Sequence, residues 1–543
     1  MDPFFQLTLA VAVSMLVIPL IRRFAPRLGL VDLPDPRKVH TVPIPRVGGW
    51  GITLGILVPV ALVFRTDPLV QSMLIGCVTL FIFGIWDDAR AIGHWTKFVG
   101  QLAAAAVVVY YGGLWVSRVP FLDSPLPAEL GKPFTVFALI GVINAINHSD
   151  GLDGLAGGES ILSLIALAVL GYKSGSALIL SVSLATIGGI VGFLRYNSHP
   201  AYVFMGDSGS QVLGFTLGCL VVYLTQTANT AVSAAMPLLI LGLPLADILS
   251  VLYQRIRAGT NWFKATRNHV HHRLMQLGFD HYETVVIIYS IQAVLVIGGV
   301  LSRYDADAAV ALIYAAVVVT LFCALNMAES RGWRVRRAHG ADSRLTHAIA
   351  ALKTSKALLK GPLLVITSVT PAMMLLNAFS VTHIPSDLAA ATALLSIVPA
   401  IYIFWPRMVN HALLRVAIYA TAIIPAYLLI SHPGDFPRGV ESVAGAMMLV
   451  LAVAIVLYVR FSAEQRFGTT PTDYLIVCGV LALLVFGSID VGSRNVVEAV
   501  LFAIVIIYAC EIIVGGSSGK SSGRLLQVST LSTLLIITLR AVM

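Results

Sequence analysis

The apolar run Phe134–Ile143 (FTVFALIGVI) leads directly into Asn144–Gly158 (NAINHSDGLDGLAGG). The first stretch has the apolar character of a membrane helix, whereas the second gathers asparagines, aspartates, a histidine and several glycines. Carboxylates and amides at the mouth of a membrane helix are costly unless they are used. The two stretches together therefore predict a membrane helix that ends in a functional site.

The composition extends this interpretation to the whole chain. Of its 543 residues, 57% are hydrophobic and only 12% are charged, whereas soluble domains are about a quarter charged. Apolar runs of roughly 17–22 residues recur, each long enough to cross about 30 Å of hydrocarbon. Because the backbone must satisfy its own hydrogen bonds in lipid, these runs should be helices. We expect an all-α, polytopic integral membrane protein with about 18 transmembrane helices.

The expected spans form two groups, an eleven-helix core within residues 1–330 and about seven further helices within residues 361–543. Residues 331–360 between them are basic and partly amphipathic, which suits either a helix on the inner leaflet or a charged connector. The polar clusters lie in the first group, so we expect the chemistry there. The predicted spans are about residues 4–21, 48–64, 69–86, 98–117, 133–146, 159–172, 178–194, 210–225, 231–254, 285–301, 308–326, 361–380, 387–405, 412–430, 441–459, 473–489, 497–514 and 525–541.

The net charge of +9 is distributed as in a membrane protein. Basic residues gather after the first, ninth and eleventh spans and alternate with loops that carry few or none. This positive-inside pattern predicts an N-terminus outside the cytoplasm and cytoplasmic loops after the odd-numbered spans. We expect no nucleic-acid partner. The first span should be a retained helix, since its MDPFF start lacks the basic region of a signal peptide.

Four polar clusters fall in loops that this topology places on the cytoplasmic side. The first is Asp87-Asp88, at the end of the third span. Neighbouring carboxylates repel each other unless a cation or a proton lies near them. The pair indicates either a catalytic base or metal-associated site, or simple solvation of a helix end.

The second cluster is the opening stretch. Asn144, Asn147 and Asp150 follow each other at i, i+3 and i+6, roughly along one helix face, and Asp153 comes after a glycine turn. Carboxylate and amide oxygens suit Mg²⁺ or Mn²⁺. The plain alternative is a turn built from Asn, Asp and Gly.

The third cluster is Phe204–Ser210 (FMGDSGS), preceded by Asn197. A Gly/Asp/Ser segment that enters a helix makes either an anion site or a plain N-cap. Asp207 within it could hold a metal that bridges phosphates.

The fourth cluster lies before the tenth span and contains His269, His271, His272 and Arg273. It could bind zinc, contact phosphates or a base, or be a solvated basic loop. Together the four clusters favour phosphoryl transfer at the membrane surface.

At these clusters the chain closely resembles the polyprenyl-phosphate N-acetylhexosamine-1-phosphate transferases of glycosyltransferase family 4. The matching motifs occur in the family's order, and the family's eleven-span core would cover about residues 4–326. The HVHHRL sequence within the last motif looks like the GlcNAc-1-phosphate transferase branch. The motifs are Asp32–Gly49, Trp86-Asp87-Asp88, Asn144–Gly158, Asn197 with Phe204–Gly209, and His269–Phe279.

The resemblance implies a reaction in the bacterial inner membrane. A UDP-N-acetylhexosamine, with UDP-GlcNAc favoured, and undecaprenyl phosphate would give the lipid-pyrophosphoryl sugar and UMP, with Mg²⁺, or Mn²⁺ as the alternative. This would be the initiating step of a cell-envelope polysaccharide such as the O-antigen of lipopolysaccharide.

The resemblance also implies residue roles. Asp207 and Asn147 would bind the metal. The catalytic residues would be Asp87 and Asp88, by the lipid phosphate, and Asp150, in the nucleotide region. Asp87 is our choice for the base that deprotonates the lipid phosphate. The expected substrate contacts are Lys97, Asn144, Asp153, Asn197, His269, His271, His272 and Arg273.

A transporter or flippase of lipid-linked sugars is the alternative from another class, because about 18 spans would suit one. The best acids, however, lie at helix ends on one side, whereas transport paths carry ionisable groups inside the membrane. Residues 361–543 carry no motif. The roles left open for them are processing or transport of the product, homo-oligomerisation and binding of a partner protein.

Overall fold

The structure is a computed structural model, and the chain divides into two compact units. One is Met1–Arg336 with Thr470–Ile489, and the other is Arg337–Thr469 with Asp490–Met543. Each unit has its own hydrophobic core. The structure describes residues 3–34, 42–122, 124–259, 268–335, 356–381, 384, 386–405, 414, 417–421, 424, 439–461, 475, 505–510, 512–514 and 520–542.

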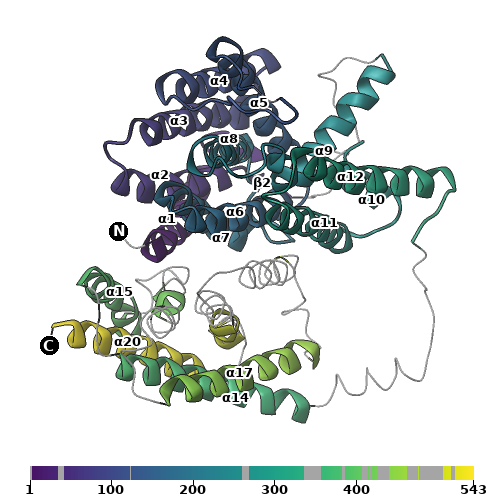
Figure 1. The fold of residues 1–543 in the computed structure, drawn as a ribbon. Coiled ribbons are helices and arrows are strands. Elements are labelled where there is room, and N and C mark those ends of the chain that lie inside the picture. Colours follow the sequence, from purple (N-terminus) through teal and green to yellow (C-terminus); the bar gives the residue numbers. More distant parts are fainter. Residues whose placement is uncertain are drawn as a thin grey trace. The chain divides into compact units, whose positions relative to one another are not determined.

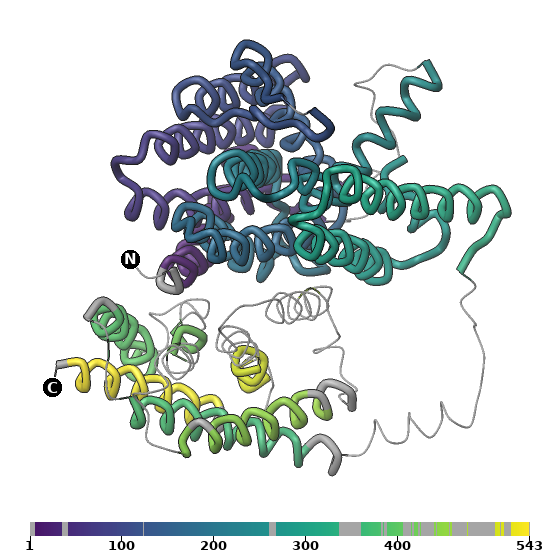
Figure 2. The backbone as a smooth tube through the Cα atoms, in the orientation of Figure 1, coloured from purple at the N-terminus to yellow at the C-terminus, as the bar shows by residue number. Residues whose placement is uncertain are grey.

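The first unit is a bundle of helices (Figures 1 and 2). A helix overlaps each of the eleven spans predicted within residues 1–330, but helical structure in the span 98–117 ends at Tyr111 and the helix in the span 231–254 begins at Met236. One two-stranded antiparallel sheet, β1 (Val31–Asp32) with β2 (Ile44–Pro45), joins α1 to α2. The predicted all-α class is confirmed. The helices are α1 (Pro3–Phe24), α2 (Gly48–Val63), α3 (Pro68–Arg90), α4 (His94–Ala106), η1 (Val107–Tyr111), α5 (Ala128–Ser149), α6 (Leu155–Lys173), α7 (Ala177–Asn197), α8 (Asp207–Tyr223), η2 (Leu224–Ala228), α9 (Met236–Arg257), α10 (Val270–Gln276), α11 (His281–Leu301) and α12 (Asp307–Ser330).

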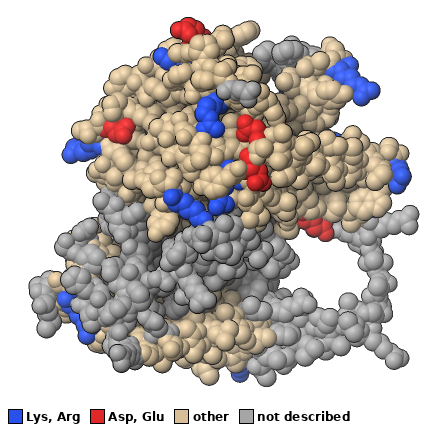
Figure 3. Space-filling view, viewed as in Figure 1, with Lys and Arg blue, Asp and Glu red and all other residues tan. Residues whose placement is uncertain are grey.

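Among the described residues, 11 helices are long and apolar enough to cross a membrane. Large apolar side chains such as Phe137, Leu312 and Val319 are exposed on the first unit, and the described surface seen in Figure 3 is mostly uncharged. Such an apolar surface suits contact with lipid. The protein is therefore an integral membrane protein, while the total of about 18 spans stays a prediction.

Helix α8 lies at the centre of the first unit, where it packs against α2, α3, α5 and α6. Glycines allow the close approach: a Cβ on Gly214 would lie 2.6 Å from the Cα of Ile143 on α5, and one on Gly76 of α3 would meet the Phe215 ring at 2.4 Å. Small residues commonly let membrane helices approach closely. This packing brings the ends of α3, α5 and α8 together.

Helix α9 is broken at Gly242, whose φ of 44° and ψ of −119° are not helical. Gln292 of α11 accepts the N–H of Leu243 at 2.8 Å and donates to Ser163 of α6 at 3.0 Å. A broken backbone at membrane depth needs such replacement partners. Gln292 thereby fixes the direction of the second half of α9, which carries Asp247.

The second unit contains α14 (Lys356–Ser380), α15 (Ser386–Phe404), α17 (Val440–Phe461) and α20 (Lys520–Val542). Helix α14 packs against α17 and α20, and α15 packs against α20. Most of the predicted linker, residues 336–355, lies outside the described residues. The predicted linker at 331–360 therefore stays a prediction.

Candidate active site

The C-terminal end of α3 meets the N-terminal end of α8 through Asp88, which is only 6% exposed. Its carboxylate accepts the backbone N–H groups of Asp207 at 2.9 Å and Ser208 at 3.2 Å, and the Ser208 hydroxyl at 2.8 Å. A carboxylate at this position satisfies free amides and complements the helix dipole. The first amides of α8 are thus bonded to a carboxylate from another helix, and an anion site at this helix end stays a prediction.

Two glycines permit this contact. A Cβ on Gly84 would lie 2.4 Å from the Cα of Ser208, and a Cβ on Gly206 would lie 2.5 Å from Asp88 Oδ2. Gly206 also has a φ of +74°, which favours glycine. The approach of α3 to α8 therefore depends on both residues.

Lys97, in the first turn of α4, lies between two acids. Its Nζ is 2.6 Å from Asp87 Oδ2 and 2.5 Å from Asp207 Oδ2. Burial alone would lower the pKa of Lys97, but the Asp207 and Asp87 carboxylates outweigh it and raise that pKa above its ordinary value. The ammonium group provides the positive charge that the two acids need in order to lie together.

Asn147, near the end of α5, completes this group. Its Nδ2 donates to Asp207 Oδ1 at 3.3 Å and to Ser210 Oγ at 2.8 Å. The two predicted metal ligands are thus neighbours. Asp87 Oδ1 is buried and has no hydrogen-bond partner among the described residues. Carboxylate and amide oxygens with one unused acceptor fit a hard divalent cation.

Two glutamines that the sequence did not single out extend the group. Gln101 Nε2 donates to Gln211 Oε1 at 3.2 Å, and Gln101 Oε1 accepts from Asn144 Nδ2 at 2.9 Å. Gln211 in turn donates to Asp207 at 3.3 Å. Gln101 follows Lys97 by four residues on α4 and so lies on the same helix face; this spacing was the available signal.

Asp150 ends α5 and is partly exposed. Burial, followed by the Asp207, Asp88 and Asp153 carboxylates, raises the pKa of Asp150 to about 7. Asp150 is therefore close enough to the acids on α3 and α8 to be influenced by their charge.

The histidine cluster on α10 meets the loop after α5. A Cβ on Gly151 would lie 2.3 Å from His271 Nε2, so the loop and the ring are in close contact. His271 and His272 have ring centroids 4.2 Å apart. Burial, and then the neighbouring His272, lowers the pKa of His271 to about 3. The His271 ring is neutral at pH 7 and can offer hydrogen bonds rather than charge.

Asp247 of α9 holds the start of α10. Its carboxylate lies 2.7 Å from His269 Nδ1 and accepts the Val270 N–H at 2.8 Å. The His269 ring also stacks on His148 of α5, with centroids 5.3 Å apart. His269, directly before α10, therefore contacts both α5 and α9 and links these two helices.

Arg273 forms its side-chain hydrogen bonds with α12 and not with Asp87 or Asp207. It is 5% exposed and donates to both carboxylate oxygens of Glu329 at 2.7 and 2.8 Å and to Asn326 at 2.6 Å. Both partners lie on α12. In the structure Arg273 joins α10 to α12, and its predicted contact with a diphosphate stays a prediction.

Asn197 and Asp153 lie between loops. Asn197 accepts the Gly154 N–H at 2.8 Å and donates to the Val203 carbonyl at 2.9 Å, so it connects the loops after α5 and α7. Asp153 lies 2.7 Å from His199 Nδ1. The predicted substrate contacts of Asn197 and Asp153 are not tested by this arrangement.

The described part of the Asp32–Gly49 motif fastens α2 to the loop before α8. The Phe204 N–H bonds to the Pro45 carbonyl at 2.8 Å, and the Gly48 N–H bonds to the Phe204 carbonyl at 2.9 Å. Arg46 pairs with Asp32. Residues 35–41 of this motif lie outside the described residues.

Part of this chain is similar in sequence to known proteins. A family model described as "Glycosyl transferase family 4" matches residues 70–225. A Bacillus subtilis (strain 168) protein named "Probable undecaprenyl-phosphate N-acetylglucosaminyl 1-phosphate transferase" is 36% identical over 307 residues, which are 55% of this chain and 85% of that protein. The chain belongs to glycosyl transferase family 4.

Further relatives within the family agree on the branch. The Escherichia coli (strain K12) "Undecaprenyl-phosphate alpha-N-acetylglucosaminyl 1-phosphate transferase" is 31% identical over 293 residues, 52% of this chain and 79% of that protein. The Haemophilus influenzae (strain ATCC 51907 / DSM 11121 / KW20 / Rd) protein of the same name is 33% identical over 298 residues, 53% of this chain and 84% of that protein. The predicted family and branch are confirmed, and this member is a membrane transferase.

Proposed function

We propose that the protein transfers N-acetylglucosamine 1-phosphate from UDP-GlcNAc to undecaprenyl phosphate and releases UMP. The observation that carries this proposal is the group formed by Asp87, Lys97, Asn147 and Asp207, which four separate helices bring together. Relatives named for transfer to undecaprenyl phosphate support the lipid acceptor. The positive-inside pattern supports a cytoplasmic site in the bacterial inner membrane.

The acids and the amide on α3, α5 and α8 suit Mg²⁺, with Mn²⁺ as the alternative. Asp207 and Asn147 would hold the ion, and the unused oxygen of Asp87 in the same group would remain available to accept a proton. When bound, Mg²⁺ neutralises phosphate charge and so lowers the repulsion between two anionic substrates.

The chain's own groups then have distinct tasks. An oxygen of the lipid phosphate attacks the β-phosphorus of the nucleotide sugar, the bond from that phosphorus to the bridging oxygen breaks, and UMP leaves. Asp87 accepts the proton of the lipid phosphate. Lys97 can contact the phosphates with the same ammonium group that now holds Asp87 and Asp207. Asp88 positions Asp207, because it caps the helix that Asp207 begins.

The loop after α5 and helix α10 are suited to the nucleotide sugar. Asn144 and Asp150 lie on the α5 side, and the rings of His271 and His272 lie on the other. His271 contacts this loop at Gly151, so both can reach one ligand. Neutral imidazoles can donate hydrogen bonds to diphosphate oxygens.

The proposal is tested by UMP release from the purified full-length protein. UDP-GlcNAc, UDP-GalNAc and UDP-glucose are each supplied with undecaprenyl phosphate and Mg²⁺, and reactions without lipid or without Mg²⁺ serve as controls. We expect UMP and a lipid-linked sugar from UDP-GlcNAc only when lipid and Mg²⁺ are present. Movement of lipid-linked sugar across vesicles with no UMP release from any donor would contradict the proposal and favour a flippase.

A further inference from the structure

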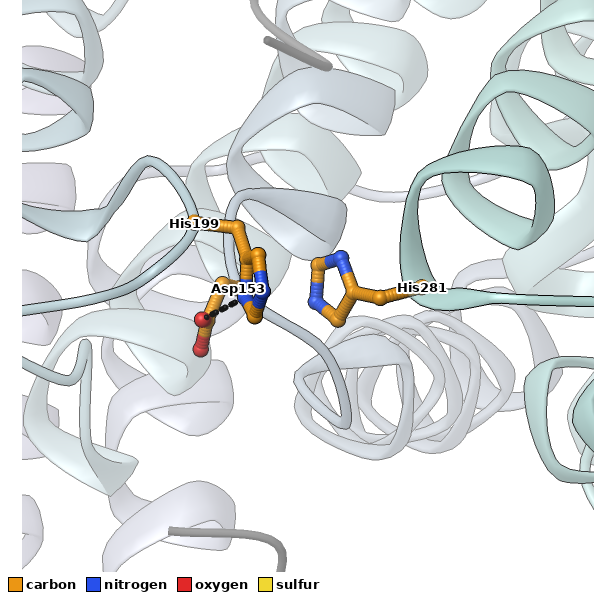
Figure 4. A group of neighbouring side chains, drawn as sticks. All are labelled: Asp153, His199 and His281. Atoms are coloured by element: carbon orange, nitrogen blue, oxygen red, sulfur yellow. Dashed lines mark hydrogen bonds and ion pairs between the residues drawn. The ribbon is translucent and has the colours of Figure 1, made fainter. Parts of the chain in front are cut away.

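Asp153, His199 and His281 converge from three parts of the first unit, outside the group of acids around Lys97 (Figure 4). Asp153 lies in the turn between α5 and α6, His199 follows α7, and His281 is the first residue of α11. Each side chain can bring one ligand atom, and these atoms all lie within 4.8 Å of one another. The fold therefore joins two imidazoles and one carboxylate that are far apart in the sequence.

The immediate contacts leave His281 with unmet hydrogen-bonding capacity. Asp153 Oδ2 lies 2.7 Å from His199 Nδ1 and accepts the Ala201 N–H at 3.1 Å. The His199 and His281 rings are stacked with centroids 4.0 Å apart and planes at 21°. Both ring nitrogens of His281 are buried and have no hydrogen-bond partner among the described residues. Buried polar atoms without a partner are costly, so His281 is suited to receive a ligand.

The chemistry of the three groups selects a class of ion. An imidazole binds a metal through a ring nitrogen in its neutral form, and each of the two histidines here offers one such nitrogen. Imidazole nitrogens with one carboxylate suit Zn²⁺ and similar transition metals. Mg²⁺ and Ca²⁺ prefer sets of oxygen ligands, such as the group formed by Asp87, Asn147 and Asp207.

We propose that Asp153, His199 and His281 form a site for a divalent transition-metal ion, with Zn²⁺ the expected occupant. Tetrahedral zinc with ligands at about 2.0–2.1 Å requires ligand atoms about 3.3 Å apart. The atoms here are at most 4.8 Å apart, so side-chain rotation can close the site. The carboxylates of Asp280 and Glu283, which cap α11, offset the unfavourable effect of the helix dipole on a cation.

The ion would act on the position of the substrate loop. Asp153 lies three residues after Asp150 and next to Gly154, whose N–H bonds to Asn197 and whose carbonyl accepts the Tyr289 hydroxyl at 2.8 Å. These bonds already join the loop to α7 and α11. The ion would add a third and stronger connection between the same elements.

The test measures metal binding directly. Full-length protein, purified without a polyhistidine tag, is stripped with a chelator and titrated with Zn²⁺ or with Co²⁺, whose visible absorption reports its ligands. We expect one Zn²⁺ per chain by elemental analysis. His281→Gln and His199→Gln should each weaken binding by more than the roughly 10–100-fold that loss of an outer-shell partner costs. His94→Gln, at an exposed histidine that begins α4, is the matched control and should bind as wild type does.

Size-exclusion elution of each variant separates loss of the site from loss of the fold. Full Zn²⁺ binding by a well-folded His281→Gln variant would overturn the proposal. So would loss of binding only in His272→Gln, which would move the ion to α10, or failure of the wild-type protein to bind Zn²⁺. UMP release is recorded separately, so that a chain that binds Zn²⁺ but transfers no sugar would reject the proposed function and keep this site.

Discussion

At the scale of single residues, the candidate active site depends on charges that would repel one another if they were alone. Asp87 and Asp207 lie on either side of the Lys97 ammonium group, and Asp88 is neutralised in part by the amides at the start of α8. Four ionisable groups, two buried and two partly exposed, can therefore lie together. The same arrangement leaves one oxygen of Asp87 unused, which suits a group that must receive a proton or an ion.

Asp87 and Asp207 should both be essential for transfer. We expect Asp87→Asn and Asp207→Asn each to reduce UMP release by at least about 100-fold, the usual loss for a group that transfers a proton or stabilises charge in the reaction. Asp305→Asn, at an exposed acid between α11 and α12, is the control. Near-normal activity in both active-site variants at wild-type expression would reject the assignment.

Asp150 should make stability depend on pH. Its pKa is raised from 3.8 to about 7 in the folded protein, so its protonated form favours folding. That contribution is fully present below about pH 4 and is lost as pH rises through 7. We expect Asp150→Asn to unfold at the wild-type temperature at low pH and at a higher temperature at pH 8.

The measurement is the midpoint of thermal unfolding at a fixed scan rate between about pH 4 and pH 8, where about 1 kcal/mol corresponds to roughly 2–4 °C. The Asp305→Asn variant provides the comparison at each pH. A difference between Asp150→Asn and wild type that does not change with pH would show that the Asp150 carboxyl is not perturbed.

At the scale of helices, the candidate site is formed by the ends of several helices rather than by their central turns. Helix α3 contributes its last turn, α8 its first, α5 its last, and α10 lies across the loop that follows α5. Glycine at each crossing allows the contact. The elements are held in place by residues outside the group of acids, including Asp247 at α10 and Gln292 at the break in α9.

The contact between Gly151 and His271 should be sensitive to a single methyl group. A Cβ on Gly151 would lie 2.3 Å from His271 Nε2, so Gly151→Ala must displace the ring or the loop. We expect at least about a 10-fold loss of kcat/KM for the nucleotide sugar, because a small displacement of a positioning group is costly. Gly141→Ala on α5 is the control, since its Cβ would meet nothing within 4 Å. Equal kinetics in the two variants would contradict a role for this contact.

Variants of Arg273 and Glu329 can show whether Arg273 holds α10 against α12 or contacts the substrate. If Arg273 mainly joins α10 to α12, Glu329→Gln should reproduce most of the defect of Arg273→Gln. Glu329 is about a third exposed, at 37%, so we expect a loss of stability of only about 1 kcal/mol. Thermal unfolding and the KM for UDP-GlcNAc are measured for both variants. A raised KM in Arg273→Gln alone would instead favour the predicted contact with the diphosphate.

At the scale of the whole molecule, one unit carries the transferase features and the other carries none that we identify. Every motif residue assigned to the site lies before Arg336, in the first unit. The Bacillus subtilis relative is matched over 85% of its own length by only 55% of this chain. The rest of this chain has no counterpart in the matched part of that relative.

A chain shortened to residues 1–336 should keep sugar transfer. The end point retains α12 and the bond from the Val335 N–H to the Leu277 carbonyl, which steadies the end of α10. We expect UMP release within a few-fold of the full-length protein, measured in the same detergent with the same lipid. Complete loss of activity in a well-folded shortened protein would show that residues after 336 contribute to the reaction, either from the second unit or from Thr470–Ile489 of the first unit.

The sequence by itself determined the membrane class and the approximate helix positions of the first unit, and it singled out the acids of the proposed site. These follow from hydropathy, charge and short motifs, which are properties of neighbouring residues. Spacing along α5 placed Asn147 on the face that meets Asp207, and the family match agreed with the motifs.

Only the tertiary structure decided which partner each polar group takes. The contacts of Asp88 with α8, of Arg273 with α12 and of His199 with His281 join residues far apart in the chain. No periodicity encodes such pairs, because they depend on how whole helices pack and on which side chains then share the small space between their ends.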